Sequence, residues 1–196
     1  MLFRSQEDII LFNNLEEITK QAEKLGLQKI IIAKSFKSKE EIKKLKDTLK
    51  NSHSGLEIKI CHLMQNADNK ELDSFVNVAD FICMLGDSLK NVSFAASNKK
   101  FDFILLQLEK NMPMSIDKET LMNAKTNNTA ILLPISSILN ANSFNKAAIL
   151  QKYSAAIKLC KKIGCDFSII SGAQSKEEMR NKKDLDETIA LFMEKT

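Results

Sequence analysis

The stretch with the clearest chemical potential follows the apolar run at residues 167–170. Ser171 and Gly172 come directly after it, and a glycine lets the backbone turn sharply and lets a ligand approach without a Cβ in the way. Ser175 lies three residues before Glu178, which is the spacing of a helix N-terminal capping box. A small polar turn between a buried strand and a capped helix is where α/β folds place their ligand sites. The sequence therefore predicts either a ligand-binding turn or a plain strand-to-helix connection here.

A second turn of this kind, Gly86-Asp87-Ser88, follows the apolar run at residues 81–85. Backbone amides that open a helix attract anions, so both turns are candidate phosphate sites. Cationic side chains follow both turns: Lys90, Arg180, Lys182 and Lys183. Arg180 is one of only two arginines in the chain, and its planar donors suit either a phosphate or a pairing with Asp184 one turn later.

The charge distribution is more informative than the net charge of +4. No carboxylate occurs between Glu119 and Asp166, where six lysines lie: Lys125, Lys146, Lys152, Lys158, Lys161 and Lys162. Uncompensated positive charge over such a length is typical of a polyanion-binding surface, and a lysine-rich solvated face is the alternative. Aromatic residues are few, at 6%, which favours contact with the backbone of folded RNA over stacking on single-stranded bases.

The predicted strand ends carry few residues that could catalyse a reaction or bind a metal. Hydrolysis at a metal needs several converging His and carboxylate ligands, and the chain has only His53 and His62. His62 lies at a strand end and is expected to be structural. Four cysteines show no C-x-x-C spacing. We therefore expect no catalytic residue, metal or cofactor. The polar residues at the predicted strand ends are Asn13, Asn14, Lys34, Ser35, His62, Gly86, Asp87, Gln107, Ser136, Ser137, Ser171 and Gly172.

Apolar strand-like runs alternate with amphipathic helix-like stretches along the whole chain. Strands are predicted at residues 8–12, 29–33, 56–63, 81–85, 101–106, 129–135 and 166–170. Helices are predicted at residues 15–25, 38–49, 69–76, 88–97, 115–124, 143–163, 175–180 and 184–194. Such alternation predicts a parallel sheet, and a TIM-like (β/α) barrel of about seven strands explains the spacing better than a doubly wound sheet. Residues 1–196 are expected to form a single domain.

Length and composition set the remaining expectations. The chain has 196 residues and is 44% hydrophobic, which is enough for one full core. No apolar run is long enough to span a bilayer, and charged residues interrupt the N-terminal stretch where a signal peptide would need its apolar core. The sequence therefore predicts a cytoplasmic protein without a membrane contact.

Several of these motifs, taken in order, resemble archaeal ribonuclease P protein component 3. Ser171-Gly172-Ala173, Arg180 and Asp184-Leu185 are similar to the C-terminal signature of that family, with Ile170 in place of its first serine. Leu85-Gly86-Asp87 with Asn91 resembles a family turn in which Val92 replaces an arginine. Further similar pieces are Ala22 to Gly26, the run at Lys29, the run at Phe101 and Lys146, which stands where the family has an arginine.

The resemblance implies a barrel related to the PHP phosphoesterases that has lost their metal ligands. It implies a subunit of ribonuclease P, an endoribonuclease whose RNA catalyses removal of the 5′ leader from precursor tRNA. Its implied partners are the ribonuclease P RNA, precursor tRNA, protein component 2 and the other ribonuclease P proteins. A metal-dependent phosphoesterase of the PHP type and a protein-only assembly module are the alternatives. The predicted RNA-binding residues are Lys90, Asn91, Lys146, Lys158, Lys162, Ser171, Gly172, Arg180, Lys182 and Lys183.

Overall fold

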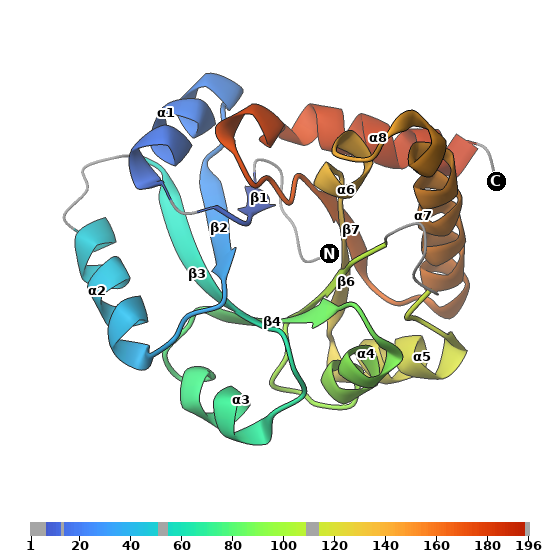
Figure 1. Ribbon diagram of the computed structural model, residues 1–196, viewed down its shortest axis with the longest axis horizontal. Coiled ribbons are helices and arrows are strands. Elements are labelled where there is room, and N and C mark those ends of the chain that lie inside the picture. Colours follow the sequence, from blue (N-terminus) through green and yellow to red (C-terminus); the bar gives the residue numbers. More distant parts are fainter. Residues whose placement is uncertain (1–6, 13, 51–54, 109–113, 195–196) are drawn as a thin grey trace.

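The fold is a barrel of parallel strands surrounded by helices. The computed structural model describes residues 7–12, 14–50, 55–108 and 114–194. Within them seven strands follow one another around the sheet in chain order, and every neighbouring pair is parallel. Figure 1 shows this ring of strands end-on with the helices outside it. The strands are β1 (Glu7–Ile10), β2 (Lys29–Lys34), β3 (Glu57–Met64), β4 (Phe81–Gly86), β5 (Phe103–Leu106), β6 (Ala130–Pro134) and β7 (Phe167–Ile170).

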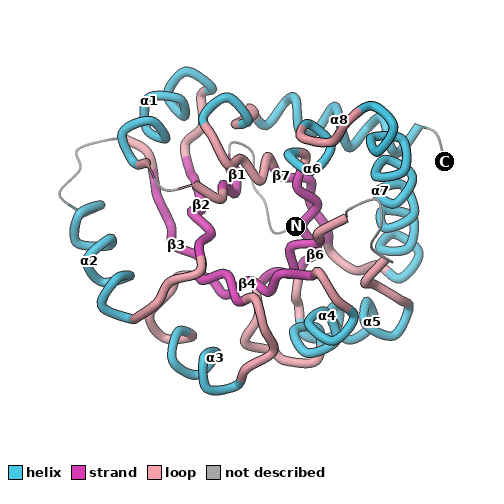
Figure 2. The backbone as a smooth tube through the Cα atoms, viewed as in Figure 1, coloured by secondary structure: helices cyan, strands magenta, loops and turns pink. Residues whose placement is uncertain are grey.

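Helices connect the successive strands and form the outer layer of the barrel, as Figure 2 shows. Parallel neighbours require such crossover connections, because each strand must begin again at the same end of the sheet. Two helical segments, α6 and α7, lie between β6 and β7. The helices are α1 (Leu15–Leu25), α2 (Lys39–Lys50), α3 (Asn69–Phe75), α4 (Leu89–Ala96), α5 (Lys118–Asn127), α6 (Ser136–Leu139), α7 (Ser143–Ile163), the 3-10 turn η1 (Lys176–Glu178) and α8 (Lys182–Glu194).

The strands are apolar on both faces because each face packs against a different layer. Alternate residues such as Ile31, Cys61 and Phe103 point inward and fill the barrel. Their neighbours, such as Ile30 and Ile60, point outward and pack under the helices. Burial on both faces explains why the strands appear in the sequence as continuous apolar runs rather than as alternating ones.

A short segment beyond β7 closes the barrel. No regular ladder joins β1 to β7 in the described residues; the contact is made by an isolated parallel bridge between Ile10 and Ala173. The amide of Gly172 donates to the carbonyl of Ile9 at 3.0 Å, and the amide of Leu11 donates to the carbonyl of Ala173 at 2.7 Å. Backbone groups of the turn after β7 therefore join the two ends of the sheet. We call these contacts, between residues 9–11 and 171–173, the barrel seam.

The predicted barrel is confirmed, and most differences lie at element ends. The helix predicted at 115–124 begins later, at Lys118, because the Asp117 side chain and Thr120 form a capping box. The short helix α6 was not predicted. The helix predicted at 175–180 is wrong, since only the 3-10 turn η1 forms there. None of the described helices has the length and apolar character needed to span a membrane.

Candidate nucleic-acid interface

The long helix α7 has one buried face and one cationic face. Its predicted apolar stripe is fully buried: Ile149, Tyr153, Ala156, Ile157 and Cys160. The Asn142 side chain caps the first turn by accepting the amide of Asn145 at 3.0 Å. Gly164 ends the helix in the left-handed conformation, at φ 72°. On the side away from the stripe Lys158, Lys161 and Lys162 are exposed.

Helix α5 lies beside α7 and adds two exposed lysines, Lys118 and Lys125 (Figure 1). The Nζ of Lys125 donates to the carbonyl oxygen of Ile163 at 2.9 Å, so it also satisfies the C-terminal end of α7. We call the following five residues the lysine face: Lys118, Lys125, Lys158, Lys161 and Lys162. In the part of the chain that the structure describes, none of them takes part in an ion pair.

The turn after β4 supports an exposed cation on a short capped helix. The Ser88 Oγ accepts the amide of Asn91 at 3.3 Å and so caps α4. Asn91 is buried, and its Nδ2 donates to the carbonyl of Gln65 at 2.8 Å and to Asp87 Oδ1 at 2.9 Å. Asn91 therefore joins α4 to the segment after β3, which is a structural role. Lys90, one residue earlier, is exposed.

The turn after β7 differs from what the sequence indicates. Ser171 is 0% exposed; its amide donates to Asp8 Oδ1 at 2.8 Å, and its Oγ accepts the amide of Ala173 at 3.2 Å. The amide of Gly172 is bonded to Ile9. The prediction that this turn offers free amides to an anion is therefore wrong, because the barrel seam uses all three. Ser175 makes no side-chain capping bond; Glu178 instead accepts the amide of Gln174 at 2.8 Å.

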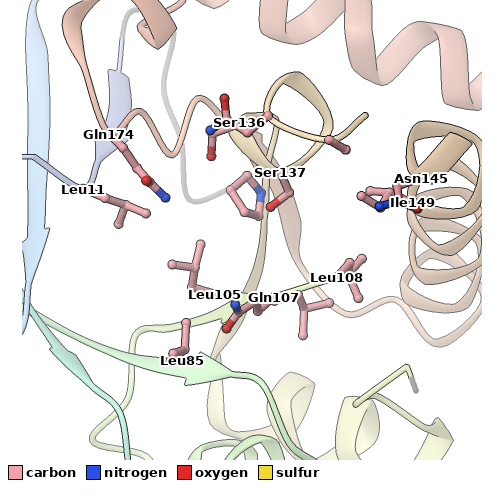
Figure 3. A pocket seen from close by; sticks show the side chains of 14 residues that line it. Leu11, Leu85, Leu105, Gln107, Leu108, Ser136, Ser137, Asn145, Ile149 and Gln174 are labelled. Carbon is pink, nitrogen blue, oxygen red and sulfur yellow. The ribbon is translucent and has the colours of Figure 1, made fainter. Parts of the chain in front are cut away.

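A cavity of about 560 Å³ opens at the carboxyl ends of the strands. Leucines at the ends of β4 and β5 form one part of its wall, and Figure 3 shows the polar side chains that surround its opening. Among the described residues that line it, none is charged. The polar lining residues are Gln107, Ser136, Ser137, Asn140, Asn145 and Gln174.

The comparisons with known proteins agree with this architecture. The family profile described as RNase P subunit p30 matches residues 11–195, nearly the whole chain. The chain belongs to the RNase P subunit p30 family. Membership makes it a protein subunit of ribonuclease P. A search of curated proteins gave no match.

Two solved structures can be set beside this p30 family member. A chain in a cryo-electron microscopy structure of archaeal ribonuclease P with mature tRNA superposes with a TM-score of 0.78 at 21% identity, covering 95% of this chain and 82% of that one. At that identity the match establishes the shared fold. The phospho-2-dehydro-3-deoxyheptonate aldolase of Thermotoga maritima reaches a TM-score of 0.44 at 11% identity, covering 97% and 68%, which is too remote to inform function.

Arg180 of the p30 family member makes hydrogen bonds within its own loop and not to Asp184. Its Nη1 donates to the carbonyls of Glu177 at 2.7 Å and Met179 at 2.8 Å. The predicted pairing with Asp184 does not form. Lys182 instead pairs with Asp186 at 2.8 Å, and Lys183 lies 3.9 Å from Glu187. Arg180 thus braces the loop that contains η1.

His62 has the structural role that the sequence favoured. It is fully buried under the outer helices, and its ring stacks on Phe75 with centroids 3.8 Å apart. Its Nδ1 accepts the amide of Phe36 at 3.3 Å, so the Nε2 N–H faces Glu71 Oε1 at 2.9 Å. Burial lowers the pKa of His62, and Glu71 opposes that shift. Among the described residues no three His, Cys, Asp or Glu side chains converge as metal ligands would.

Asp8 is the important residue that sequence reasoning missed. It is 0% exposed, and its Oδ1 accepts the amides of Ile9 and Ser171, both at 2.8 Å. Its Oδ2 is buried without a hydrogen-bond partner among the described residues. Burial raises the pKa of Asp8 to about 7, against the lowering effect of these hydrogen bonds and of the Lys182 charge. Strand β1 looked like an ordinary apolar run, so nothing local in the sequence indicated this role.

Proposed function

We propose that this chain supports the RNA of ribonuclease P, during removal of the 5′ leader of precursor tRNA, by contacting the RNA backbone through the lysine face. The lysine face is the observation that carries the proposal. None of its five ammonium groups forms an ion pair within the described residues, and four of them lie in the interval between residues 119 and 166 that has no acidic side chain. The fifth, Lys118, lies between Asp117 and Glu119 at the start of α5, which is packed beside α7. When such groups neutralise RNA phosphates, the counterions condensed on the RNA are released, and this release favours binding.

The same reasoning divides the predicted RNA-binding residues into two groups. Lys90 and Lys146 remain proposed contacts beside Lys158 and Lys162, and Lys182 and Lys183 are proposed as weaker contacts because they are paired with acidic residues of α8. The remaining four predicted residues hold the fold together through internal hydrogen bonds, and RNA contact by them is not proposed: Asn91, Ser171, Gly172 and Arg180.

A partnership with the other ribonuclease P proteins, including protein component 2, is part of this proposal. So is a cytoplasmic location. The four cysteines are all buried free thiols, which suits a reducing compartment.

Reconstitution of the holoenzyme tests the proposal. Lys158→Gln with Lys162→Gln removes two charges one turn apart on α7, and Lys39→Gln with Lys43→Gln is the matched control on α2, where carboxylates are neighbours. The α7 pair should reduce the slope of log affinity against log salt by about one unit per lost phosphate contact. The α2 pair should leave the slope unchanged. Equal effects of the two pairs, or no effect of omitting the chain on precursor cleavage, would contradict the proposal.

One specific observation favours a second candidate, contact with protein alone. Between α5 and α7 lies a groove of about 540 Å³ in which Met122 is 52% exposed beside Leu159 and Ile163, with three members of the lysine face around them. Apolar side chains among lysines suit a protein segment that carries an apolar anchor and carboxylates. If the chain contacts protein alone, Met122→Ser should weaken its assembly with a partner protein and leave its affinity for RNA unchanged. That affinity should then depend little on salt.

A further inference from the structure

The cavity at the barrel mouth has the chemistry of a site for a flat, uncharged group that forms hydrogen bonds. Leu11, Leu85 and Leu105 give it an apolar wall, and the opening carries carboxamides from three different parts of the chain (Figure 3). Gln107 follows β5, Asn145 belongs to the first turn of α7, and Gln174 follows the barrel seam. A volume of about 560 Å³ lies within the range of small-molecule pockets, roughly 300–1,000 Å³.

The described residues of this lining carry no charge, which disfavours the ligands that the lysine face would attract. A phosphate, a carboxylate or an ammonium group buried here would have no counter-charge among the described lining residues, and unpaired buried charge is costly. A carboxamide presents one acceptor and one donor side by side, and Asn or Gln matches the edge of adenine in this way. Bases taken out of a stack are held between apolar side chains and read through their hydrogen-bonding edge.

We propose that the cavity at the barrel mouth binds an unpaired adenine base. Helix α7 connects this site to the lysine face, because Asn145 and Ile149 line the cavity while Lys158 and Lys162 lie further along the same helix. An RNA that contacts the lysine face and extends past the first turn of α7 can place one base in the cavity. The inference deepens the proposed function and rests on it for the source of the base, although a free adenine nucleoside has the same chemistry.

The rim of the cavity is held in place before any ligand arrives. Asn140 Nδ2 donates to Glu178 Oε1 at 2.9 Å, while the other oxygen of that carboxylate accepts the amide of Gln174 at 2.8 Å. Glu178 therefore fixes the two sides of the opening relative to each other. Its negative charge behind the rim also disfavours an anionic ligand there. Rigid, prearranged polar groups reduce the entropy that binding costs.

Titration of the isotope-labelled full chain, followed by nuclear magnetic resonance of side-chain amides, tests the proposal directly. Adenosine should shift the side-chain amide signals of Asn145 and Gln174, and uridine should shift them much less. Adenosine monophosphate should bind no more tightly than adenosine, because no cation lines the cavity among the described residues. Inorganic phosphate should leave both signals unchanged. Competition by phosphate, or tighter binding of the monophosphate, would overturn the proposal in favour of an anion site.

Matched variants separate base recognition from a general loss of stability. Asn145→Leu with Gln174→Leu keeps side-chain volume but removes two carboxamides, and it should weaken adenosine binding about tenfold. Gln151→Leu makes the same kind of change on an exposed position of α7 outside the cavity and should have no effect. Ala141→Phe should block the cavity and abolish binding. Unchanged affinity in the double variant would overturn the proposal.

A pentaadenylate RNA distinguishes a base in a strand from a free nucleoside. If the pentamer shifts the Asn145 and Gln174 signals and free adenosine does not, the base is delivered by the strand. A pentauridylate of the same length should then fail to produce the shifts but keep its affinity for the lysine face. No shift with any of these probes would overturn the inference. Loss of the salt dependence in Lys158→Gln/Lys162→Gln reports separately on the proposed function.

Discussion

Two turns with similar sequences, Gly86-Asp87-Ser88 after β4 and Ser171-Gly172-Ala173 after β7, have opposite roles in this molecule. The β4 turn opens a capped helix and leaves Ser88 and Lys90 exposed. The β7 turn is fully buried and gives its three amides to Asp8, Ile9 and Ser171. The sequence predicts that both turns start helices and bind anions, but only the β4 turn starts a helix of more than one turn.

The difference comes from the position of each strand in the barrel. Strand β4 is paired along its length with β3 and β5, so its turn has no further ladder to make. Strand β7 is paired with β6 on one side only and must still reach β1 to close the ring. Buried backbone groups must find partners, so the turn after β7 adopts the hydrogen bonding of a strand instead of binding a ligand. Two similar turns can thus have different roles: one closes the barrel, and the other remains exposed at the surface.

Replacing the two glycines by alanine should give the largest contrast. At Gly172 the backbone has φ +55°, and a Cβ would lie 2.4 Å from Pro134 Cβ, so strain and overlap add up. Gly172→Ala should cost about 3 kcal/mol or more of unfolding free energy. At Gly86 a Cβ would meet Leu106 Cδ2 at 3.0 Å, Ile104 Cγ2 at 3.1 Å and the carbonyl oxygen of Leu105 at 3.2 Å, without the left-handed strain of Gly172, so Gly86→Ala should cost less, about 1–2 kcal/mol. Urea unfolding of both variants makes the measurement, and equal losses would contradict the special role of the seam.

Asp8 should make the seam sensitive to pH. The pKa of Asp8 is raised to about 7 from an ordinary 3.8, so between these values the folded chain holds a proton that the unfolded chain releases. Its contribution to stability is therefore present below about pH 4 and is lost as pH rises towards 7, by at most about 1.4 kcal/mol per pH unit. Asp8→Asn should remove this decline. The difference between wild type and variant, measured by urea unfolding at pH 5 and 7.5, isolates Asp8 from other titrating groups such as His62.

The same residue tests the seam's hydrogen bonds independently of charge. Asp8→Ala should destabilise the fold by ~1–3 kcal/mol at pH 5, because it leaves the buried amide of Ser171 without its partner. Asp8→Asn retains an acceptor and should cost less at that pH. If the two variants were equally stable at pH 5, the bond to Ser171 would not hold the barrel closed.

Ser88→Ala should have a smaller effect at the open turn. The substitution removes the oxygen that accepts the amide of Asn91, and loss of such a cap costs ~1 kcal/mol. Ser175→Ala is the matched control after β7, because Ser175 makes no side-chain capping bond and should be nearly neutral. Thermal melting of the pair would show whether capping separates the two turns. A larger loss for Ser175 than for Ser88 would reverse the assignment.

Arg180→Lys should have the smallest effect on stability, under about 1 kcal/mol. The ammonium group keeps the charge and can still donate to one of the two carbonyls that Arg180 Nη1 now contacts. Activity of the reconstituted holoenzyme per folded molecule should stay unchanged, because the guanidinium braces its own loop. An unchanged melting temperature with RNA-dependent activity weakened by ~1–3 kcal/mol would instead show that Arg180 contacts RNA.

The barrel, the two faces of the long helix and the lysine-rich interval all follow from local patterns in the sequence. Helix α7 could be predicted because the repeat of Ile149, Tyr153, Ile157 and Cys160 is local, and a buried stripe leaves the lysines on the opposite side. The runs of β2 to β6 were predicted for the same reason. The interval without carboxylates is also visible in the sequence, because the charge of each residue type does not depend on the fold.

The closure of the barrel and the lining of its mouth depend instead on contacts between segments that are distant in the sequence. The bond between the Ser171 amide and Asp8 joins residues 163 positions apart, and no local pattern in β1 distinguishes a seam carboxylate from an ordinary strand residue. The cavity likewise assembles Gln107, Asn145 and Gln174 from three separate connections. Periodicity reports which residues are buried within one element, whereas closure and cavities depend on which elements meet. Their contacts arise from packing and hydrogen bonding between distant segments, which the order of residues alone does not reveal.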